Sequence, residues 1–164
     1  MKTKPITEKL YGLIVLYEMH TDFLKRALDG IAESDVQKRL DTKANHIAWI
    51  TGSVVDGRYY LAKSFGLDLE SSTLELFKDN HSIIDDAKYP SINEFLEDWD
   101  NVSAKLEEAL VNATDEKLNE PIEMPGMKMT LFDMISFTIY REANCIGQIA
   151  LWRRLLGYKR MNYM

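Results

Sequence analysis

The stretch from residue 130 to residue 157 constrains the fold most strongly. It begins at Thr130, which has Asp133 three residues further on and is therefore a suitable helix N-cap, and it reaches Gly157 without a proline. Apolar residues occur on most sides of the expected helix, so we expect it to lie deepest in the molecule. Such a helix needs partner helices that cover its apolar surface.

Three further segments, residues 6–31, 43–65 and 91–110, show the spacing of apolar residues that is typical of amphipathic helices. Gly30 is expected to end the first segment, and Gly66 is expected to be the C-cap of the second. Ser91 and Glu94 form a capping box at the start of the third, and Ser34 with Gln37 predicts another for a short helical turn. The three apolar stripes consist of Ile6, Leu10, Leu13, Tyr17, Leu24, Leu28 and Ile31, of Ile47, Ile50, Val54 and Leu61, and of Phe95, Trp99, Val102, Leu106 and Leu110.

Four amphipathic helices without strand-like alternation predict an all-α four-helix bundle, with residues 1–164 forming a single domain. The link between the second and third helices, residues 67–90, is long, and we expect it to cross an end of the bundle or to line a site. A helical turn is expected inside it at Leu74–Phe77. Residues 114–129 contain Pro121 and Pro125, which forbid a continuous helix there.

The charge balance excludes some partners. The net charge is −6, and nothing in it favours nucleic acid, which requires a basic face. The basic cluster of Arg153, Arg154, Lys159 and Arg160 lies near the end of the last helix, so we interpret it as offsetting the helix dipole. No apolar run approaches the roughly 18 residues of a membrane span, and we expect no membrane partner.

A cytoplasmic location is expected. Cys145 is the only cysteine, so no internal disulfide can form, which fits a reducing compartment. Lys2 and Lys4 precede an apolar stretch, which loosely resembles a signal peptide, but Glu8 and Lys9 interrupt it and no cleavage site follows. We therefore interpret the chain as intact.

Two sequence motifs resemble those of the DinB/YfiT-like family of small metal-binding four-helix bundles. Residues 45–53 read Asn-His-Ile-Ala-Trp-Ile-Thr-Gly-Ser, similar to the family's Ile-Ala-Trp-Ile-x-Gly-His. Glu142, Gly147 and Gln148 match the frame of its His-Glu-x-x-His-x-Gly-Gln, and residues 155–158 resemble its ending. The resemblance implies a bundle with a pocket at one end, often a homodimer, and relatives that include metal-dependent thiol transferases and hydrolases.

The resemblance also implies that the family's metal ligands are replaced. Its three histidines fall on Ser53, Arg141 and Cys145. A serine hydroxyl is a poor ligand for zinc or nickel, arginine stays protonated, and one thiolate is not a site. We therefore expect no metal and no cofactor. A shifted set of His46, Glu142 and Cys145 is an alternative, although a histidine such as His46 is more often structural.

Three interpretations of the substituted site remain open. Arg141 and Cys145 are four residues apart and share a helix face, and the resemblance brings Ser53 opposite them. Arg141 could fill the former metal cavity by a salt bridge to Glu18 or Asp56, or its guanidinium could bind a small anionic ligand. In the third interpretation, Cys145 is a nucleophile whose pKa the arginine lowers. The possible pocket neighbours are His46, Trp49, Asp56 and Glu142.

These interpretations lead to different functions. The expected function is binding, assembly or an altered reaction in a degenerate metal site. The alternatives are a metal-dependent hydrolase or thiol S-transferase that uses replacement ligands, and a dimeric structural protein with a filled cavity. Gly147 is expected to allow close helix packing, Gln148 to bond across the bundle, and His20 to lie on the surface or in a structural contact.

Overall fold

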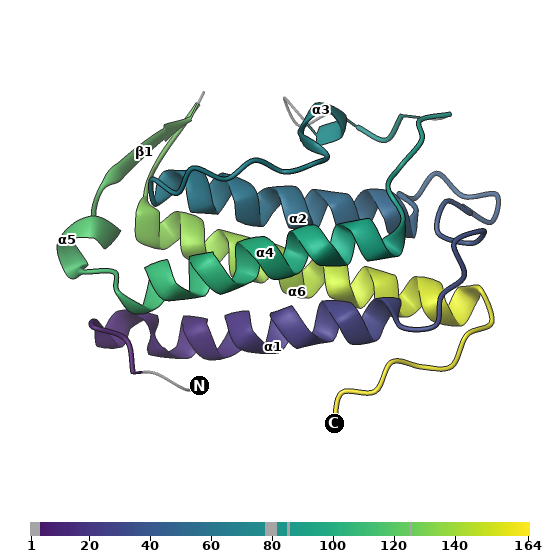
Figure 1. Cartoon of the computed structure of the whole chain (residues 1–164), viewed down its shortest axis with the longest axis horizontal. Helices are drawn as coiled ribbons and strands as arrows, with labels where there is room; N and C mark the ends of the chain where they lie inside the picture. Colours follow the sequence, from purple (N-terminus) through teal and green to yellow (C-terminus); the bar gives the residue numbers. More distant parts are fainter. Residues whose placement is uncertain (1–3, 78–81, 85, 125) are drawn as a thin grey trace.

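The four long helices form a bundle (Figure 1). The computed structural model describes residues 4–77, 82–84, 86–124 and 126–164. Helices α1 and α2 each pack against both α4 and α6. The all-α four-helix fold is thus confirmed. The elements are η1 (Glu8–Leu10), α1 (Tyr11–Leu28), α2 (Ile47–Ser64), α3 (Leu74–Phe77), α4 (Ile92–Val111), α5 (Asp115–Leu118), β1 (Pro121–Met124), β2 (Met127–Thr130) and α6 (Leu131–Leu155).

Helices α1 and α6 run in one direction, and α2 and α4 run in the other (Figure 1). Because α2 and α4 are parallel, the link between them must return along the whole bundle. It does so on the outer side of α2, and the expected turn at α3 packs on that helix. The link therefore runs lengthwise along the bundle. Its crossing of an end, one of the two expectations for this link, was wrong.

Local capping signals set the ends of the helices. The Ser91 hydroxyl accepts from the Glu94 amide at 3.2 Å while the Glu94 carboxylate accepts from the Ser91 amide at 2.8 Å. Thr130 and Asp133 form the same reciprocal pair, and Gly66 follows α2 with φ of +83°. These three predictions are confirmed.

The Ser34 capping box and the expected absence of strands were wrong, whereas the predicted lack of a continuous helix over residues 114–129 is confirmed. Ser34 does not cap a helix, because residues 33–37 form turns and the Gln37 amide reaches the Ala87 carbonyl at 3.5 Å. Residues 114–130 contain the short helix α5 and an antiparallel hairpin, in which Ile122 of β1 pairs with Met129 of β2. The four-residue strands are too short to show a clear alternating pattern.

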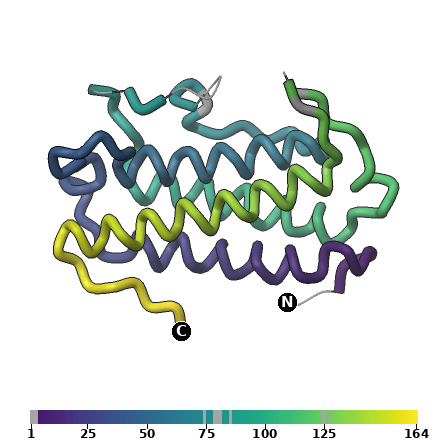
Figure 2. Tube along the Cα trace, turned by 180° about the vertical axis from the view of Figure 1, so that it is seen from behind, coloured from purple at the N-terminus to yellow at the C-terminus, as the bar shows by residue number. Residues whose placement is uncertain are grey.

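Helix α2 is more buried than α6, so the expectation that α6 lies deepest was wrong. Twelve of the 18 residues of α2 are buried, compared with twelve of the 25 residues of α6. One face of α6 is open, and from behind the bundle this helix is seen in front of the others (Figure 2). Its exposed apolar residues are Phe137, Tyr140, Leu151 and Leu155.

Two expectations for α6 were wrong because Gly147 and Gln148 lie on its open face. A Cβ at Gly147 would meet no atom within 4 Å, so this glycine is not needed for packing within the described chain. Gln148 is exposed and bonds to Asn144 on its own helix at 3.2 Å. Within the described ranges, no helix has both the length and the apolar character to cross a membrane.

Candidate functional site

Arg141 joins α6 to α2 through Ser53. Its Nη1 donates to the Ser53 carbonyl oxygen at 2.9 Å, and its Nη2 donates to the Ser53 hydroxyl at 2.5 Å. Gly57 lies one turn further along α2, and a Cβ there would stand 3.0 Å from Nη1. The missing side chain at Gly57 therefore makes room for the guanidinium against the backbone of α2.

Arg141 influences the neighbouring Asp56 through its charge. Burial raises the pKa of the Asp56 carboxyl, and the nearby Arg141 charge opposes that shift. Among the described residues, Arg141 makes no ion pair within 4.0 Å with Glu18 or Asp56. The guanidinium is thus held by hydrogen bonds to Ser53, and its charge is only partly balanced.

Cys145 is a buried thiol with a raised pKa. Its side chain is 8% exposed. Burial is the largest effect on its pKa and raises it, Arg141 lowers it, and Glu142 raises it again. The neutral thiol therefore dominates at neutral pH, which argues against the nucleophile interpretation. Two histidines are engaged elsewhere, and His81 lies outside the described residues.

Glu142 points into the centre of the bundle, where it meets Arg58 of α2. The Arg58 Nε lies 2.7 Å from Oε1 of Glu142, and Nη2 lies 2.9 Å from Oε2. The two side chains are 0% and 2% exposed. This forked, charge-assisted contact is the strongest type of ion pair available to arginine.

All four long helices contribute to the environment of Arg58. The aromatic rings of Tyr17 and Trp99 lie 3.7 and 3.6 Å from its guanidinium carbon. Nη1 also donates to the hydroxyls of Thr21 at 2.7 Å and Ser103 at 2.6 Å. The guanidinium therefore has stacking and hydrogen-bond partners that compensate for its burial.

The charges within this network explain the ionised state of Glu142. Burial alone would raise the pKa of Glu142. However, the charge and hydrogen bonds of Arg58 and the contact with His20 outweigh burial and hold the pKa below its usual value. His20 Nδ1 lies 3.2 Å from Oε2 of Glu142. The side chain of His20 is buried, so of its two expected placements the structure shows the structural contact.

The sequence contained an unused signal for Arg58. It lies four residues after Val54 and three before Leu61, and so falls on the apolar stripe of the second helix. A cation on such a stripe needs a buried anion, and Glu142 lies on the buried face of α6. The sequence thus indicates that Arg58 needs a buried anion, and the structure identifies that anion as Glu142.

His46 and Trp49 have structural contacts at the start of α2. The Nδ1 atom of His46 accepts from the Trp49 amide at 3.1 Å, so His46 is the N-cap of the helix. Its ring also meets Tyr89 edge-on at 4.8 Å. The indole Nε1 of Trp49 and the hydroxyl of Thr51 are buried without a hydrogen-bond partner among the described residues. Trp49 therefore borders Ser53 but makes no polar contact to it.

The positions that match the family's metal ligands do not fit a divalent metal. They present a hydroxyl that is already bonded, a guanidinium and a protonated thiol. In the part of the chain that the structure describes, no three His, Cys, Asp or Glu residues gather so as to hold a metal ion. The shifted set also fails, because Glu142 is engaged by Arg58 while His46 caps α2.

These features define a four-helix bundle in which an arginine connects the second long helix to the last. The family model of the DinB superfamily matches residues 16–149, so the chain belongs to the DinB superfamily. The match includes both motifs that carried the resemblance. A comparison with curated proteins finds no match.

Proposed function

We propose that this protein is a metal-independent member of the DinB superfamily whose role is binding or assembly. In this proposal the Arg141 guanidinium takes the place of the metal cation. The observation that carries it is the double hydrogen bond from Arg141 to Ser53, 2.9 Å to the carbonyl and 2.5 Å to the hydroxyl. A fixed, permanently protonated group here supplies positive charge and cross-links α2 to α6 without a metal.

Restoring the histidines tests this proposal. The triple variant Ser53→His/Arg141→His/Cys145→His should bind close to one equivalent of zinc or nickel, because three imidazoles make a competent ligand set. The unchanged protein, purified without chelator and then exposed to each metal, should retain none after dialysis. Elemental analysis measures both. One equivalent in the unchanged protein would overturn the proposal and favour a metal-dependent hydrolase or thiol transferase with replacement ligands.

A second candidate function is the binding of a small anion at Arg141. It is supported by the partial exposure of this side chain and by the absence of an ion pair with a described carboxylate. The nearby Asp56 would favour a ligand with one negative charge, such as a monocarboxylate, over one with several. Acetate and benzoate titrations followed by NMR should shift residues around Ser53. Loss of these shifts in Arg141→Met, with Arg154→Met as control, would support the candidate.

We also propose that the protein forms a homodimer through the open face of α6. Phe137 and Tyr140 are 55% and 66% exposed, and Leu151 and Leu155 continue the same side of the helix. Two such stripes, with Gly147 between them, can approach closely in a self-complementary contact. Light scattering should give twice the chain mass, and Phe137→Glu/Tyr140→Glu should give a monomer. The control is Tyr60→Glu, which changes an exposed aromatic residue of α2.

A further inference from the structure

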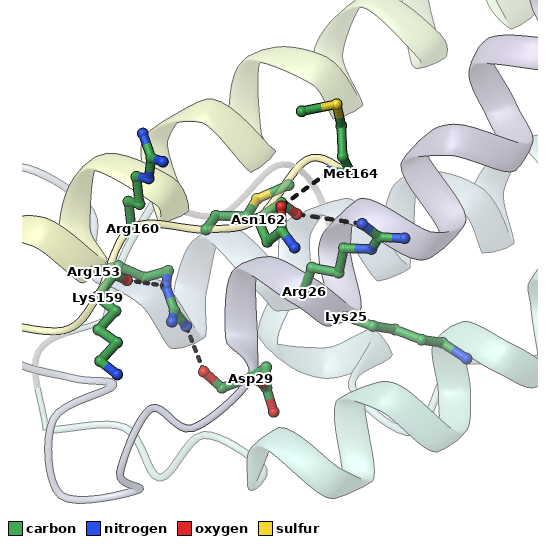
Figure 3. Close-up of a pocket in the computed structure, with 9 residues that line it drawn as sticks. Lys25, Arg26, Asp29, Arg153, Lys159, Arg160, Asn162 and Met164 are labelled. Atoms are coloured by element: carbon green, nitrogen blue, oxygen red, sulfur yellow. Dashed lines mark hydrogen bonds between the residues drawn. The ribbon is translucent and has the colours of Figure 1, made fainter.

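A basic cavity lies where the C-terminal ends of α1 and α6 meet. Residues 158–164 fold back from the end of α6 towards α1, and Tyr163 meets Phe23 of α1 edge-on at 5.5 Å. The cavity between this tail and α1 has a volume of about 640 Å³ (Figure 3). Its lining consists of Lys25, Arg26, Asp29, Arg153, Lys159, Arg160, Met161, Asn162 and Met164.

Arg153 forms the floor of the cavity and is 7% exposed. Its Nε donates to the Lys159 carbonyl at 3.2 Å, and its Nη1 donates to the carbonyls of Ala27 at 3.0 Å and Asp29 at 2.5 Å. The two N–H groups of Nη2 make no hydrogen bond to any described residue. This guanidinium also has no ion pair with a carboxylate in the described ranges, so three neutral carbonyls alone compensate its buried charge.

The surrounding charges do not neutralise this centre. Lys25 is paired with Asp100 at 2.5 Å, and Arg26 is paired with Asp22 at 2.6 Å. Asp29 is the only acidic residue among the lining residues. Lys159 and Arg160 are exposed and form no ion pair with a described residue. The lining therefore has a net positive charge on a chain whose net charge is −6.

An offset of the helix dipoles accounts for only part of this arrangement, because Arg153 donates to the Ala27 and Asp29 carbonyls at the end of α1 with Nη1 alone. Cations near the last turn of a helix contribute favourably from the surface. Here Arg153 is buried and reaches across to the end of α1, and the tail carries Lys159 beside it, whereas the Arg160 side chain extends away from the Arg153 guanidinium (Figure 3). A buried guanidinium with two free N–H groups, in a cavity that Lys159 and Arg160 also line, suits an anion with more than one charge.

We propose that this cavity binds the phosphate group of a small molecule. A phosphate dianion offers several acceptor oxygens, which match the two free N–H groups of Arg153 Nη2 and the cations of Lys159 and Arg160 in the cavity lining. Met161 and Met164 give the cavity an apolar wall that an organic substituent on the phosphate would contact. The proposed site is formed by basic residues of α6 and of residues 158–164. It does not depend on Arg141 or on the absence of a metal.

Calorimetric titration at constant ionic strength tests the proposal with inorganic phosphate, pyrophosphate and phenyl phosphate. At least one should bind with Kd below about 1 mM, with sulfate weaker. Tighter binding of phenyl phosphate would identify an organic phosphate as the ligand, whereas tighter binding of the inorganic ions would identify free phosphate or pyrophosphate. NMR shifts should concentrate at residues 25–30 and 153–162. No binding of any of the three overturns the proposal.

Matched variants separate a site from general charge attraction. Lys159→Ala/Arg160→Ala removes two exposed cations whose side chains form no hydrogen bond or ion pair with a described residue, and should raise Kd by at least about tenfold. Lys63→Ala/Lys105→Ala removes the same charge from exposed positions of α2 and α4 and should change Kd by less than about twofold. Arg153→Lys keeps the charge but loses the fork and should also weaken binding. Equal losses in the two double variants would overturn the proposal, and an Arg141→Met variant should bind phosphate normally.

Discussion

Arg58 and Glu142 form a two-pronged ion pair in the centre of the bundle, with N–O distances of 2.7 and 2.9 Å. The pair joins α2 to α6, and the hydrogen bonds of Arg58 to Thr21 and Ser103 add α1 and α4. A bundle of purely apolar stripes could shift or rotate its helices at small cost. A buried pair with fixed geometry disfavours such alternatives, because any other register would leave a charge unpaired.

Removing one partner of this pair should strongly destabilise the protein. Arg58→Met leaves the Glu142 carboxylate buried without its main partner, and we expect a loss of about 3–5 kcal/mol in the free energy of unfolding. The double variant Arg58→Met/Glu142→Leu should lose less than Arg58→Met alone, since no buried charge remains. Urea unfolding followed by circular dichroism measures both. A single variant within about 0.5 kcal/mol of the unchanged protein would contradict the assigned role.

The same pair should make stability depend on acid pH. The pKa of Glu142 in the folded protein lies below its ordinary value of 4.5. The folded state therefore binds a proton less readily than the unfolded state, and the stabilisation is present above pH 4.5 and is lost as the pH falls below it.

We expect the free energy of unfolding to fall more steeply below pH 4.5 in the unchanged protein than in Arg58→Met/Glu142→Leu. Exposed carboxylates with lowered pKa, such as Glu94 and Asp133, contribute in the same direction but are present in both proteins. The difference between the two pH profiles, measured by urea unfolding from pH 3 to 7, therefore isolates the buried pair. Parallel profiles would show that Glu142 keeps an ordinary pKa.

Two helical glycines should respond to alanine in opposite directions. A Cβ at Gly52 would lie 2.4 Å from the Phe77 ring and 2.8 Å from the Phe95 ring, whereas at Gly147 it would meet nothing within 4 Å. Gly52→Ala should therefore cost about 1–3 kcal/mol through overpacking. Gly147→Ala should gain about 0.5–1 kcal/mol, because alanine loses less backbone entropy in a helix.

Thermal unfolding at low protein concentration measures this pair of variants. Low concentration keeps any contact between two α6 faces from adding to the result. If Gly52→Ala were neutral, Phe77 and the link that carries it would not be firmly packed on α2. If Gly147→Ala were destabilising in the monomer, this glycine would have a packing role within the chain after all.

The four helices could be predicted because their signals are local. The capping boxes at Ser91 and Thr130 and the C-cap glycine at Gly66 involve residues within one turn of each helix end. The family resemblance added the expected partnership between Ser53 and Arg141, and the structure places these two residues in direct contact. Whether they form a functional site remains a prediction.

The rest depends on contacts between distant parts of the chain. Arg58 and Glu142 are 84 residues apart, and no pattern in the residues around either one shows that it will pair with the other. The basic cavity needs the tail to fold back on α1, which is decided by contacts such as that between Tyr163 and Phe23. The sequence showed the basic cluster but not that Arg153 would be buried at the end of another helix.

Cys145 should react slowly with alkylating agents. Burial raises the pKa of its thiol, so the reactive thiolate is scarce at neutral pH, and only 8% of the residue is exposed. With iodoacetamide at pH 7 we expect a rate several-fold below that of the same protein unfolded in urea.

The alkylation rate should still rise with pH well above the pH at which the rate of an unperturbed thiol levels off. Arg141→Met should shift this profile to higher pH, because the arginine charge favours the thiolate, whereas Arg154→Met should leave it unchanged. A native thiol that reacts as fast as the unfolded one, or a profile that levels off near neutral pH, would revive the interpretation of Cys145 as a nucleophile.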